Sequence, residues 1–206
     1  MSSAEGLAVD RVHVWRGERH VLKGVSCTVR PGELLHVRGP NGTGKTTLLR
    51  VICGLLRPEQ GEVRWDGAPT ERVRASFQRS LAYASHEPAL KGDLTAIENL
   101  AFTVGLKRPV RRTELEAFLR RTGAAALLDL PVRMLSAGQR RRVALARVLA
   151  LESKLWLLDE PYTNLDAGGV ALLSELLAEH RGRGGLALVV AHHEVPAVSD
   201  RLELAA

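Results

Sequence analysis

A glycine-rich segment near residue 40 carries the residue types that bind nucleotide phosphates. Residues 39–46 read GPNGTGKT, which fits the spacing G-x-x-x-x-G-K-[ST] and lies between a predicted strand at 34–38 and a predicted helix from Thr46. Glycines let backbone N–H groups curl around phosphate oxygens, and the following helix points its positive end at the same anion. Lys45 is expected to reach the β- and γ-phosphates of ATP, Thr46 to ligate Mg²⁺ and Thr47 to add a phosphate donor. The predicted phosphate-binding residues are Gly39, Pro40, Asn41, Gly42, Thr43, Gly44, Lys45, Thr46 and Thr47.

Two carboxylates end an apolar segment further along the chain. Residues 155–160 read LWLLDE, a predicted strand that is apolar until Asp159 and Glu160. Open α/β folds bind ligands at the carboxyl ends of their strands, so both side chains are expected at the nucleotide site. We expect Asp159 to hold Mg²⁺ directly or through water, and Glu160 to polarise the attacking water. Alone, the pattern also fits an acidic turn at a strand end, but the phosphate loop upstream favours hydrolysis of ATP.

A second segment that can attract an anion begins at residue 136. Residues 135–139 read LSAGQ, and Ser136-x-x-Gln139 matches a capping box that opens a helix running to about Leu151. The N-terminus of a helix attracts anions through its unpaired N–H groups. Because the loop at 39–46 already holds the phosphates, we infer that this helix end serves the nucleotide of a neighbouring subunit.

An α/β framework must position these segments. Apolar strands separated by helices indicate a parallel sheet covered on both faces. The fold class we predict is α/β, with a P-loop core, a small β-rich front lobe and a helical lobe inserted at roughly 88–150 of a single 206-residue domain. Thr95-x-x-Glu98 and Thr113-x-x-Glu116 each match a capping box and predict helices that start near 96 and 114. The predicted strands lie at 7–14, 20–29, 34–38, 61–67, 155–158 and 186–191, and a last helix is predicted at 169–181.

Composition and charge exclude some classes of protein. No stretch approaches the roughly 18 to 20 apolar residues needed to span a bilayer, and no basic segment followed by an apolar one marks a secretory signal. Cys27 and Cys53 are the only cysteines and lack the spacing of a metal or redox site, so we expect two reduced, small hydrophobes. The net charge of +6 permits nucleic acid or an anionic membrane as a partner. We interpret the arginines, including the run at 140–142, as solvated surface, core packing or ion pairs.

Taken in order, the motifs resemble those of ABC-transporter nucleotide-binding domains. The order is the loop at 39–46, LSAGQ at 135–139, LWLLDEP at 155–161, NLD at 164–166 and a strand ending in His192. The resemblance covers essentially the whole chain and implies a RecA-like core with an antiparallel β lobe and a helical lobe. It also implies a head-to-tail dimer, with two ATP molecules sandwiched between one subunit's P-loop and the other's signature helix.

The same resemblance implies roles for individual residues. Ser136, Gly138 and Gln139 would face the γ-phosphate of the partner's ATP. Asp166 would bridge the two subunits at the nucleotide site. His192 would contact the γ-phosphate and take part in catalysis beside the carboxylate that polarises water.

Two positions depart from the general pattern of the family. Where many members place an aromatic ring that stacks on adenine, this chain has Arg16, with Trp15 just before it. Arginine can stack on a base through its guanidinium plane, and Trp15 either reaches the base instead or packs on the β lobe. Where the family has a glutamine that senses Mg²⁺, this chain has His86, which can make a hydrogen bond and change charge near neutral pH. Arg16 is therefore our expected nucleotide contact, and His86 our expected additional group at the metal.

The second departure resembles a narrower group. The segment HEPALKGDLTAIENL at 86–100, the compact chain and GEVRWDG at 61–67 are similar to the ATPase subunits of bacterial cytochrome c maturation systems, a haem-export family. That resemblance implies two ATPase copies docked on integral membrane permease subunits, peripheral to the cytoplasmic face of the inner membrane. Haem is expected to be involved only indirectly, because the chain has no CxxCH pattern. Two alternatives stay open: an ABC exporter ATPase for another cargo, or a soluble ABC ATPase associated with nucleic acid, although we expect no nucleic-acid partner.

Overall fold

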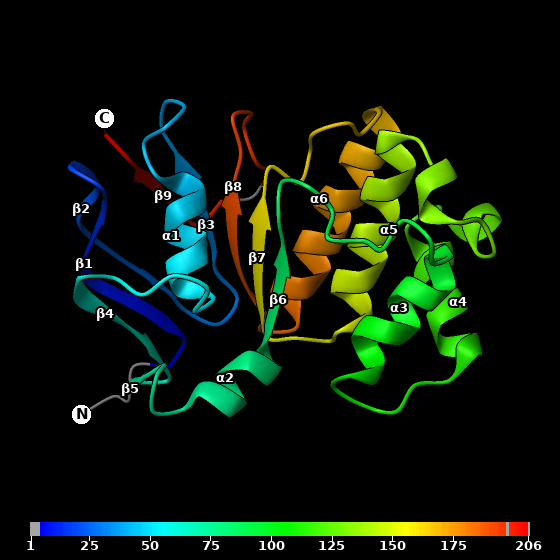
Figure 1. Ribbon diagram of the computed structural model, residues 1–206, viewed down its shortest axis with the longest axis horizontal. Helices are drawn as coiled ribbons and strands as arrows, with labels where there is room; N and C mark the ends of the chain where they lie inside the picture. Colours follow the sequence, from blue (N-terminus) through cyan, green and yellow to red (C-terminus); the bar gives the residue numbers. More distant parts are fainter. Residues whose placement is uncertain (1–4, 197, 206) are drawn as a thin grey trace.

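Residues 5–196 and 198–205 are described by a computed structural model, in which two β-sheets are flanked by helices (Figure 1). The antiparallel sheet contains β1 (Leu7–Arg16), β2 (Arg19–Val29), β4 (Gln60–Trp65) and β5 (Ala68–Pro69), in the order β2-β1-β4-β5. The parallel sheet contains β3 (Leu34–Arg38), β6 (Leu81–Ala84), β7 (Leu155–Asp159), β8 (Leu186–Val190) and β9 (Asp200–Glu203), in the order β6-β7-β8-β3-β9. The fold is the α/β fold predicted from the sequence.

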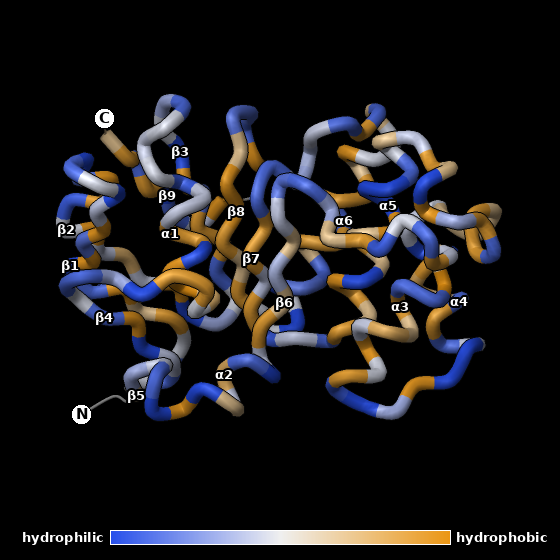
Figure 2. The backbone as a smooth tube through the Cα atoms, viewed as in Figure 1, coloured by the Kyte–Doolittle hydropathy of each residue, from blue (hydrophilic) through white to orange (hydrophobic). Residues whose placement is uncertain are grey.

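The strands of the parallel sheet supply side chains to two cores. Every residue of β7 and β8 is buried. Leu157 packs in a core shared with the antiparallel sheet and α1 (Lys45–Ile52), whereas its neighbour Trp156 packs in a core beneath α6 (Ala167–Gly182). Because both faces of the sheet are covered, these strands need continuous apolar runs rather than alternation. The central strands are accordingly among the most hydrophobic segments of the backbone (Figure 2).

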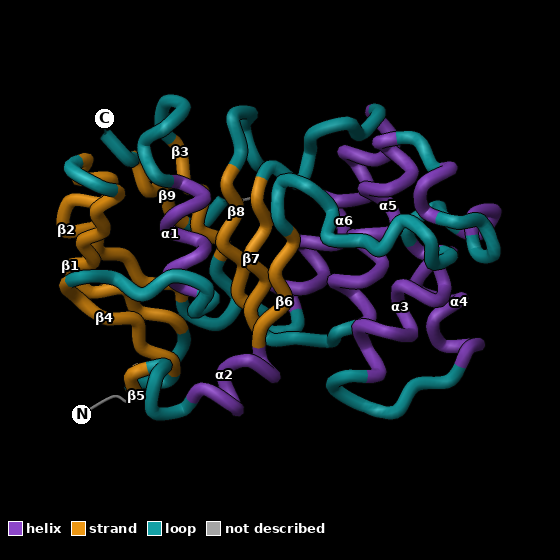
Figure 3. The backbone as a smooth tube through the Cα atoms, viewed as in Figure 1, coloured by secondary structure: helices purple, strands orange, loops and turns teal. Residues whose placement is uncertain are grey.

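Three helices form a group at the end of the molecule opposite the antiparallel sheet (Figure 3). They are α3 (Ala96–Gly105), α4 (Arg112–Arg121) and α5 (Ala137–Ala150), and they pack on one another around a third core. Two 3₁₀ turns, η1 (Ala125–Leu127) and η2 (Val132–Met134), connect α4 to α5. This group lies within the range predicted for the helical lobe.

Two of the three predicted capping boxes are confirmed. Thr95 and Ser136 each accept a hydrogen bond from the backbone N–H three residues later, and the side chains of Glu98 and Gln139 close both boxes. These reciprocal bonds satisfy N–H groups that a helix start leaves without partners.

The third capping box, at Thr113, is wrong. The helix begins one residue before it, at Arg112, with Arg111 as the N-cap and no side-chain cap. Glu116, which was expected to close the box, instead accepts a hydrogen bond from Arg112 Nε at 3.0 Å. This i,i+4 pair along the helix surface takes the carboxylate away from the helix start.

One helix and three strands were not predicted. They are α2 (Arg74–Ser80), β5, β6 and β9. Cys27 and Cys53 are free thiols, and burial raises the pKa of Cys27 to about 12, in keeping with the prediction of inert hydrophobes. Among the residues described, no helix combines the length and apolar character needed to cross a bilayer.

Candidate active site

The loop between β3 and α1 can be built only with glycine at two of its positions. Gly39 has φ +140°, and a Cβ there would lie 2.4 Å from the carbonyl oxygen of Leu204. Gly44 has φ +98°, and a Cβ there would lie 2.7 Å from Leu22 Cδ2. Both positions combine a positive φ with a close approach that a side chain would block. A side chain at either position would therefore disrupt the loop that leads into α1.

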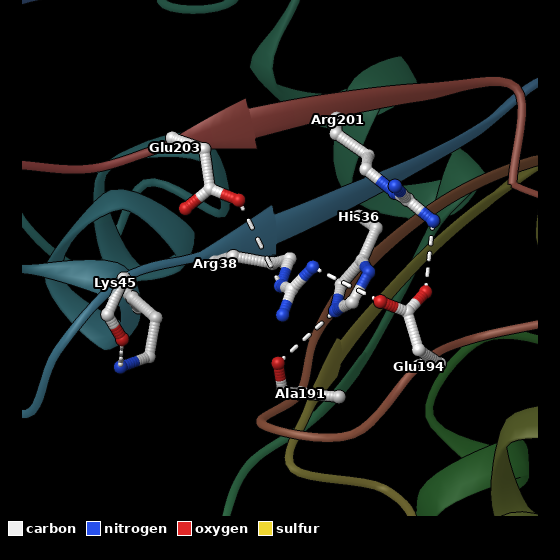
Figure 4. A network of polar contacts seen from close by, with 8 residues as sticks. His36, Arg38, Lys45, Ala191, Glu194, Arg201 and Glu203 are labelled. Carbon is white, nitrogen blue, oxygen red and sulfur yellow. Dashed lines mark hydrogen bonds and ion pairs between the residues drawn. The ribbon is translucent and has the colours of Figure 1, made fainter.

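Lys45 is bent back over this loop. Its Nζ donates hydrogen bonds to the carbonyl oxygens of Gly39 at 2.7 Å and Pro40 at 3.0 Å, and the side chain curls toward the loop (Figure 4). The residue is only 8% exposed. Among the described residues, the hydrogen bonds of this buried ammonium go only to neutral carbonyl oxygens, so the position suits a bound phosphate.

A pocket of about 580 Å³ opens in front of the loop. It brings together the phosphate loop, the carboxyl ends of β7 and β8, and the tip of the β1–β2 hairpin. It is lined by Arg16, Arg19, Val21, Asn41, Gly42, Gly44, Lys45, Thr46, Thr47, His86, Asp159, Glu160, Thr163, Val190 and His192. Gly39, Pro40 and Thr43, also predicted to bind phosphate, lie in the loop but do not line the pocket. Thr43 Oγ1 instead donates to the carbonyl oxygen of Pro40 at 3.0 Å.

Thr46 and Asp159 meet at the floor of this pocket. Thr46 Oγ1 donates a hydrogen bond to Asp159 Oδ2 at 2.9 Å, across 113 residues of sequence. Burial raises the pKa of Asp159, while the bond from Thr46 and the charges of His86, Arg50 and Lys45 oppose that rise. A raised carboxyl pKa means that the ionised form costs the folded chain stability as pH rises through that pKa. A bound cation would offset this cost.

Glu160 and His192 lie side by side at the ends of β7 and β8. Glu160 Oε1 is 3.3 Å from His192 Nε2. This oxygen is buried and makes no hydrogen bond among the described residues. Glu160 also has φ +49°, uncommon for a residue other than glycine, and its N–H donates to the carbonyl oxygen of Val190 at 2.9 Å. A carboxylate oxygen with unused accepting capacity, facing a pocket, can receive a proton from water.

His86 also reaches the pocket wall. Its charge acts on Asp159, and its carbonyl oxygen accepts a hydrogen bond from Arg141 Nη2 at 2.7 Å. Arg141 is buried and lies on α5, so it ties the signature helix to the loop that carries His86. The sequence had shown this arginine only as one member of a basic run.

At the hairpin tip, the structure separates the two adenine-site candidates. Arg16 lines the pocket. Trp15 does not line it, because its ring stacks on His20 with 3.9 Å between centroids and 6° between planes. Arg19, which sequence reasoning missed, also lines the pocket and donates to the carbonyl oxygen of Gly42 at 2.8 Å. Arg19 pairs with Arg16 across a two-residue turn. A hairpin predicted at this turn would have placed Arg19 beside Arg16 at the nucleotide site.

The predicted signature residues do not reach this pocket. Ser136, Gly138 and Gln139 lie at the start of α5, where a Cβ on Gly138 would be 2.8 Å from the carbonyl oxygen of Asn164. Asp166 caps α6 by accepting from the N–H of Gly169 at 2.8 Å, and it also pairs with Arg142 at 2.8 Å within the same chain. None of these four predicted site residues lines the pocket.

A phosphate loop between a strand and a helix, with carboxylates at the end of another strand of the same parallel sheet, defines a P-loop nucleotide hydrolase. The sequence matches the ABC transporter family over residues 22–163, and the chain belongs to that family. It is therefore an ATP-binding, ATP-hydrolysing subunit of the ABC type.

Relatives and solved structures agree with this assignment. The chain is 47% identical to the cytochrome c biogenesis ATP-binding export protein CcmA of Salmonella typhi, over 90% of this chain and 88% of that protein. It is 44% identical to the protein of that name in Methylococcus capsulatus, over 94% of each chain. A solved dimeric bacterial ABC transporter cassette aligns with a TM-score of 0.85 and 26% identity, over 97% of this chain and 94% of that one. An ATP-binding subunit of an ABC transporter aligns with a TM-score of 0.83 and 27% identity, over 91% and 79%.

Proposed function

We propose that this chain is the ATPase subunit that drives the export step of c-type cytochrome maturation. The observation that carries the hydrolytic part is the buried Oε1 of Glu160, which makes no hydrogen bond among the described residues and lies beside His192. The pathway is supported by 44% to 47% identity to cytochrome c biogenesis export proteins along nearly the whole chain. ATP turnover would power either haem export or release of a haem-loaded chaperone. In both cases partner proteins would bind the haem itself.

Thr46 and Asp159 are proposed to hold Mg²⁺. Their oxygen atoms lie 2.9 Å apart at the pocket floor, and hydroxyl and carboxylate oxygens are the donors this ion prefers. Held by these two residues, Mg²⁺ would supply positive charge that offsets the negative charge developing on the phosphates during hydrolysis. His86 lies near enough to act on Asp159 and is proposed as an additional group near the metal.

The remaining pocket residues have separate proposed roles. Lys45 binds the β- and γ-phosphates together with the backbone of the loop. Glu160 takes a proton from the attacking water. The oxygen of that water bonds to the γ-phosphorus while the bond between the γ-phosphorus and the bridging oxygen breaks. His192 contacts the γ-phosphate, and Arg16 packs its guanidinium plane on the adenine ring.

A second copy of the chain is proposed to complete the site. The capped start of α5 presents a helix N-terminus away from the chain's own pocket, which suits a phosphate held by another subunit. Ser136, Gly138 and Gln139 would contact that phosphate, with Asp166 at the interface between the two copies. Two copies would work with integral membrane permease subunits at the cytoplasmic face of the inner membrane.

The pathway is tested in cells that lack this gene. A haem stain of membrane proteins separated by denaturing electrophoresis detects covalently attached haem, and we expect the c-type cytochrome bands to disappear and to return with the wild-type gene. If the bands persist without any second copy of the gene, the haem pathway is wrong, and an ABC exporter for another cargo takes its place.

A further inference from the structure

The loop that carries His192 is attached to β3 by a buried histidine. His36 is fully buried, and the other residues between 34 and 37 are leucine or valine, so a polar ring is unexpected there. Its Nε2 lies 3.0 Å from the carbonyl oxygen of Ala191, the residue before His192. Because a carbonyl can only accept, Nε2 carries the proton. Nδ1 has no hydrogen-bond partner among the described residues, so the bond to Ala191 is the one that the ring makes there.

The hydrogen bond from His36 lies just beyond the end of β8. In the register of the sheet His36 lies opposite Val189, so its ring reaches two residues further along, to the point where β8 has ended. There the backbone leaves the sheet and turns into the loop 191–194. Burying an imidazole in an apolar core costs more free energy than burying an aliphatic side chain, and a hydrogen bond offsets part of that cost. The bond it makes sets where that loop begins.

The other end of the loop is held by charge. Glu194 Oε1 accepts from Arg38 Nη1 at 3.1 Å, and Glu194 Oε2 accepts from Arg201 Nη2 at 2.8 Å. Figure 4 shows Glu194 between these two guanidinium groups, which come from β3 and β9. Arg38 is followed directly by Gly39, the first residue of the phosphate loop. The strand that leads into the phosphate loop therefore holds both ends of the loop that carries His192.

We propose that His36 and the Arg38–Glu194–Arg201 ion pairs are positioning residues that hold His192 in register with the phosphate loop and Glu160. None of them lines the nucleotide pocket, so they act through the loop and not on the nucleotide. The proposal rests on the role proposed above for His192. It requires that these groups affect turnover more than nucleotide binding, because displacements near an angstrom are costly in the transition state.

The test compares kcat and KM for ATP in four variants of the full-length chain. His36→Leu should lower kcat about tenfold to a hundredfold, with KM within about twofold of wild type. His36→Gln places an amide N–H close to the position of Nε2 and should restore most of kcat. Glu194→Gln, on the exposed loop, should lower kcat about threefold to tenfold even if the core variant folds poorly. Glu203→Gln is the matched control, because Glu203 pairs with Arg38 but lies outside the loop, and it should leave kcat unchanged.

A fifth and a sixth variant separate this proposal from the role of His192. His36→Leu added to His192→Ala should cause no further loss of kcat, because a positioning residue has nothing left to position. A full additive loss, or wild-type kcat in both His36→Leu and Glu194→Gln, overturns the proposal. Wild-type kcat in His192→Ala alone would instead show that the role of His192 is wrong. Loss of activity in His192→Ala with none in either His36→Leu or Glu194→Gln overturns only the positioning proposal.

Discussion

Glu160→Gln is expected to lower the kcat for ATP hydrolysis by about a hundredfold or more while ATP still binds with near wild-type affinity. The amide keeps the shape and the contact with His192 but cannot take a proton from water. Oε1 of Glu160 makes no hydrogen bond among the described residues, so the substitution breaks none on which the fold depends. Steady-state turnover together with equilibrium binding of a fluorescent ATP analogue measures the two effects separately.

Glu175→Gln is the matched control for that change. Glu175 is an exposed residue of α6, and it carries the same charge away from the pocket. Its substitution should leave both turnover and affinity at wild-type values. Turnover by Glu160→Gln at the wild-type rate would show that another group accepts the proton.

Lys45→Ala is expected to weaken ATP binding by about a hundredfold. Hydrogen bonds to a charged group contribute about 1.5 to 3 kcal/mol, and each 1.4 kcal/mol is a factor of ten in affinity. The side chain of Lys45 is buried, and among the described residues its Nζ donates hydrogen bonds only to the carbonyl oxygens of Gly39 and Pro40. The nucleotide supplies the missing anionic partner, so most of the loss should appear in Kd.

Isothermal titration with ATP and Mg²⁺ measures this loss, and Lys154→Ala is its control. Lys154 is an exposed lysine that precedes β7, at the edge of the sheet away from the phosphate loop. Removing it should not change Kd. Unchanged affinity in Lys45→Ala would mean that the phosphates bind elsewhere.

Segments whose structure is decided locally could be predicted from the sequence. The phosphate loop needs glycine at Gly39 and Gly44 for reasons of backbone geometry alone, and it lies where the pattern placed it. The capped helix starts at Thr95 and Ser136 are equally local. The buried strand at Leu155–Asp159 follows from its continuous apolar run.

Features that depend on distant partners could not be predicted in this way. β9 (Asp200–Glu203) is short, polar and mostly exposed, and it is a strand only because β3 offers its edge. α2 has a single buried residue, Phe77, so it shows no helical period of apolar residues. The role of His36 in the predicted strand at 34–38 could not be seen, because its partner Ala191 lies 155 positions away. The failed capping box at Thr113 shows that a local pattern loses when a stronger neighbour, here Arg112, binds the same carboxylate.

A hydrolysis site shared between two copies of the chain is the central claim, and mixing two inactive variants tests it most directly. Lys45→Ala removes the phosphate contact of a chain's own pocket. Ser136→Asp keeps a good N-cap residue at the start of α5 but points a negative charge at the partner's γ-phosphate. ATPase activity is measured for each variant alone and for an equal mixture allowed to exchange partners.

We expect each variant alone to be nearly inactive and the mixture to recover up to about a quarter of wild-type activity, because about half of the pairs contain both variants and each of those has one intact site. No recovery in a mixture shown to exchange partners would contradict the account. So would full activity of Ser136→Asp alone, which would mean that a single chain completes its own site.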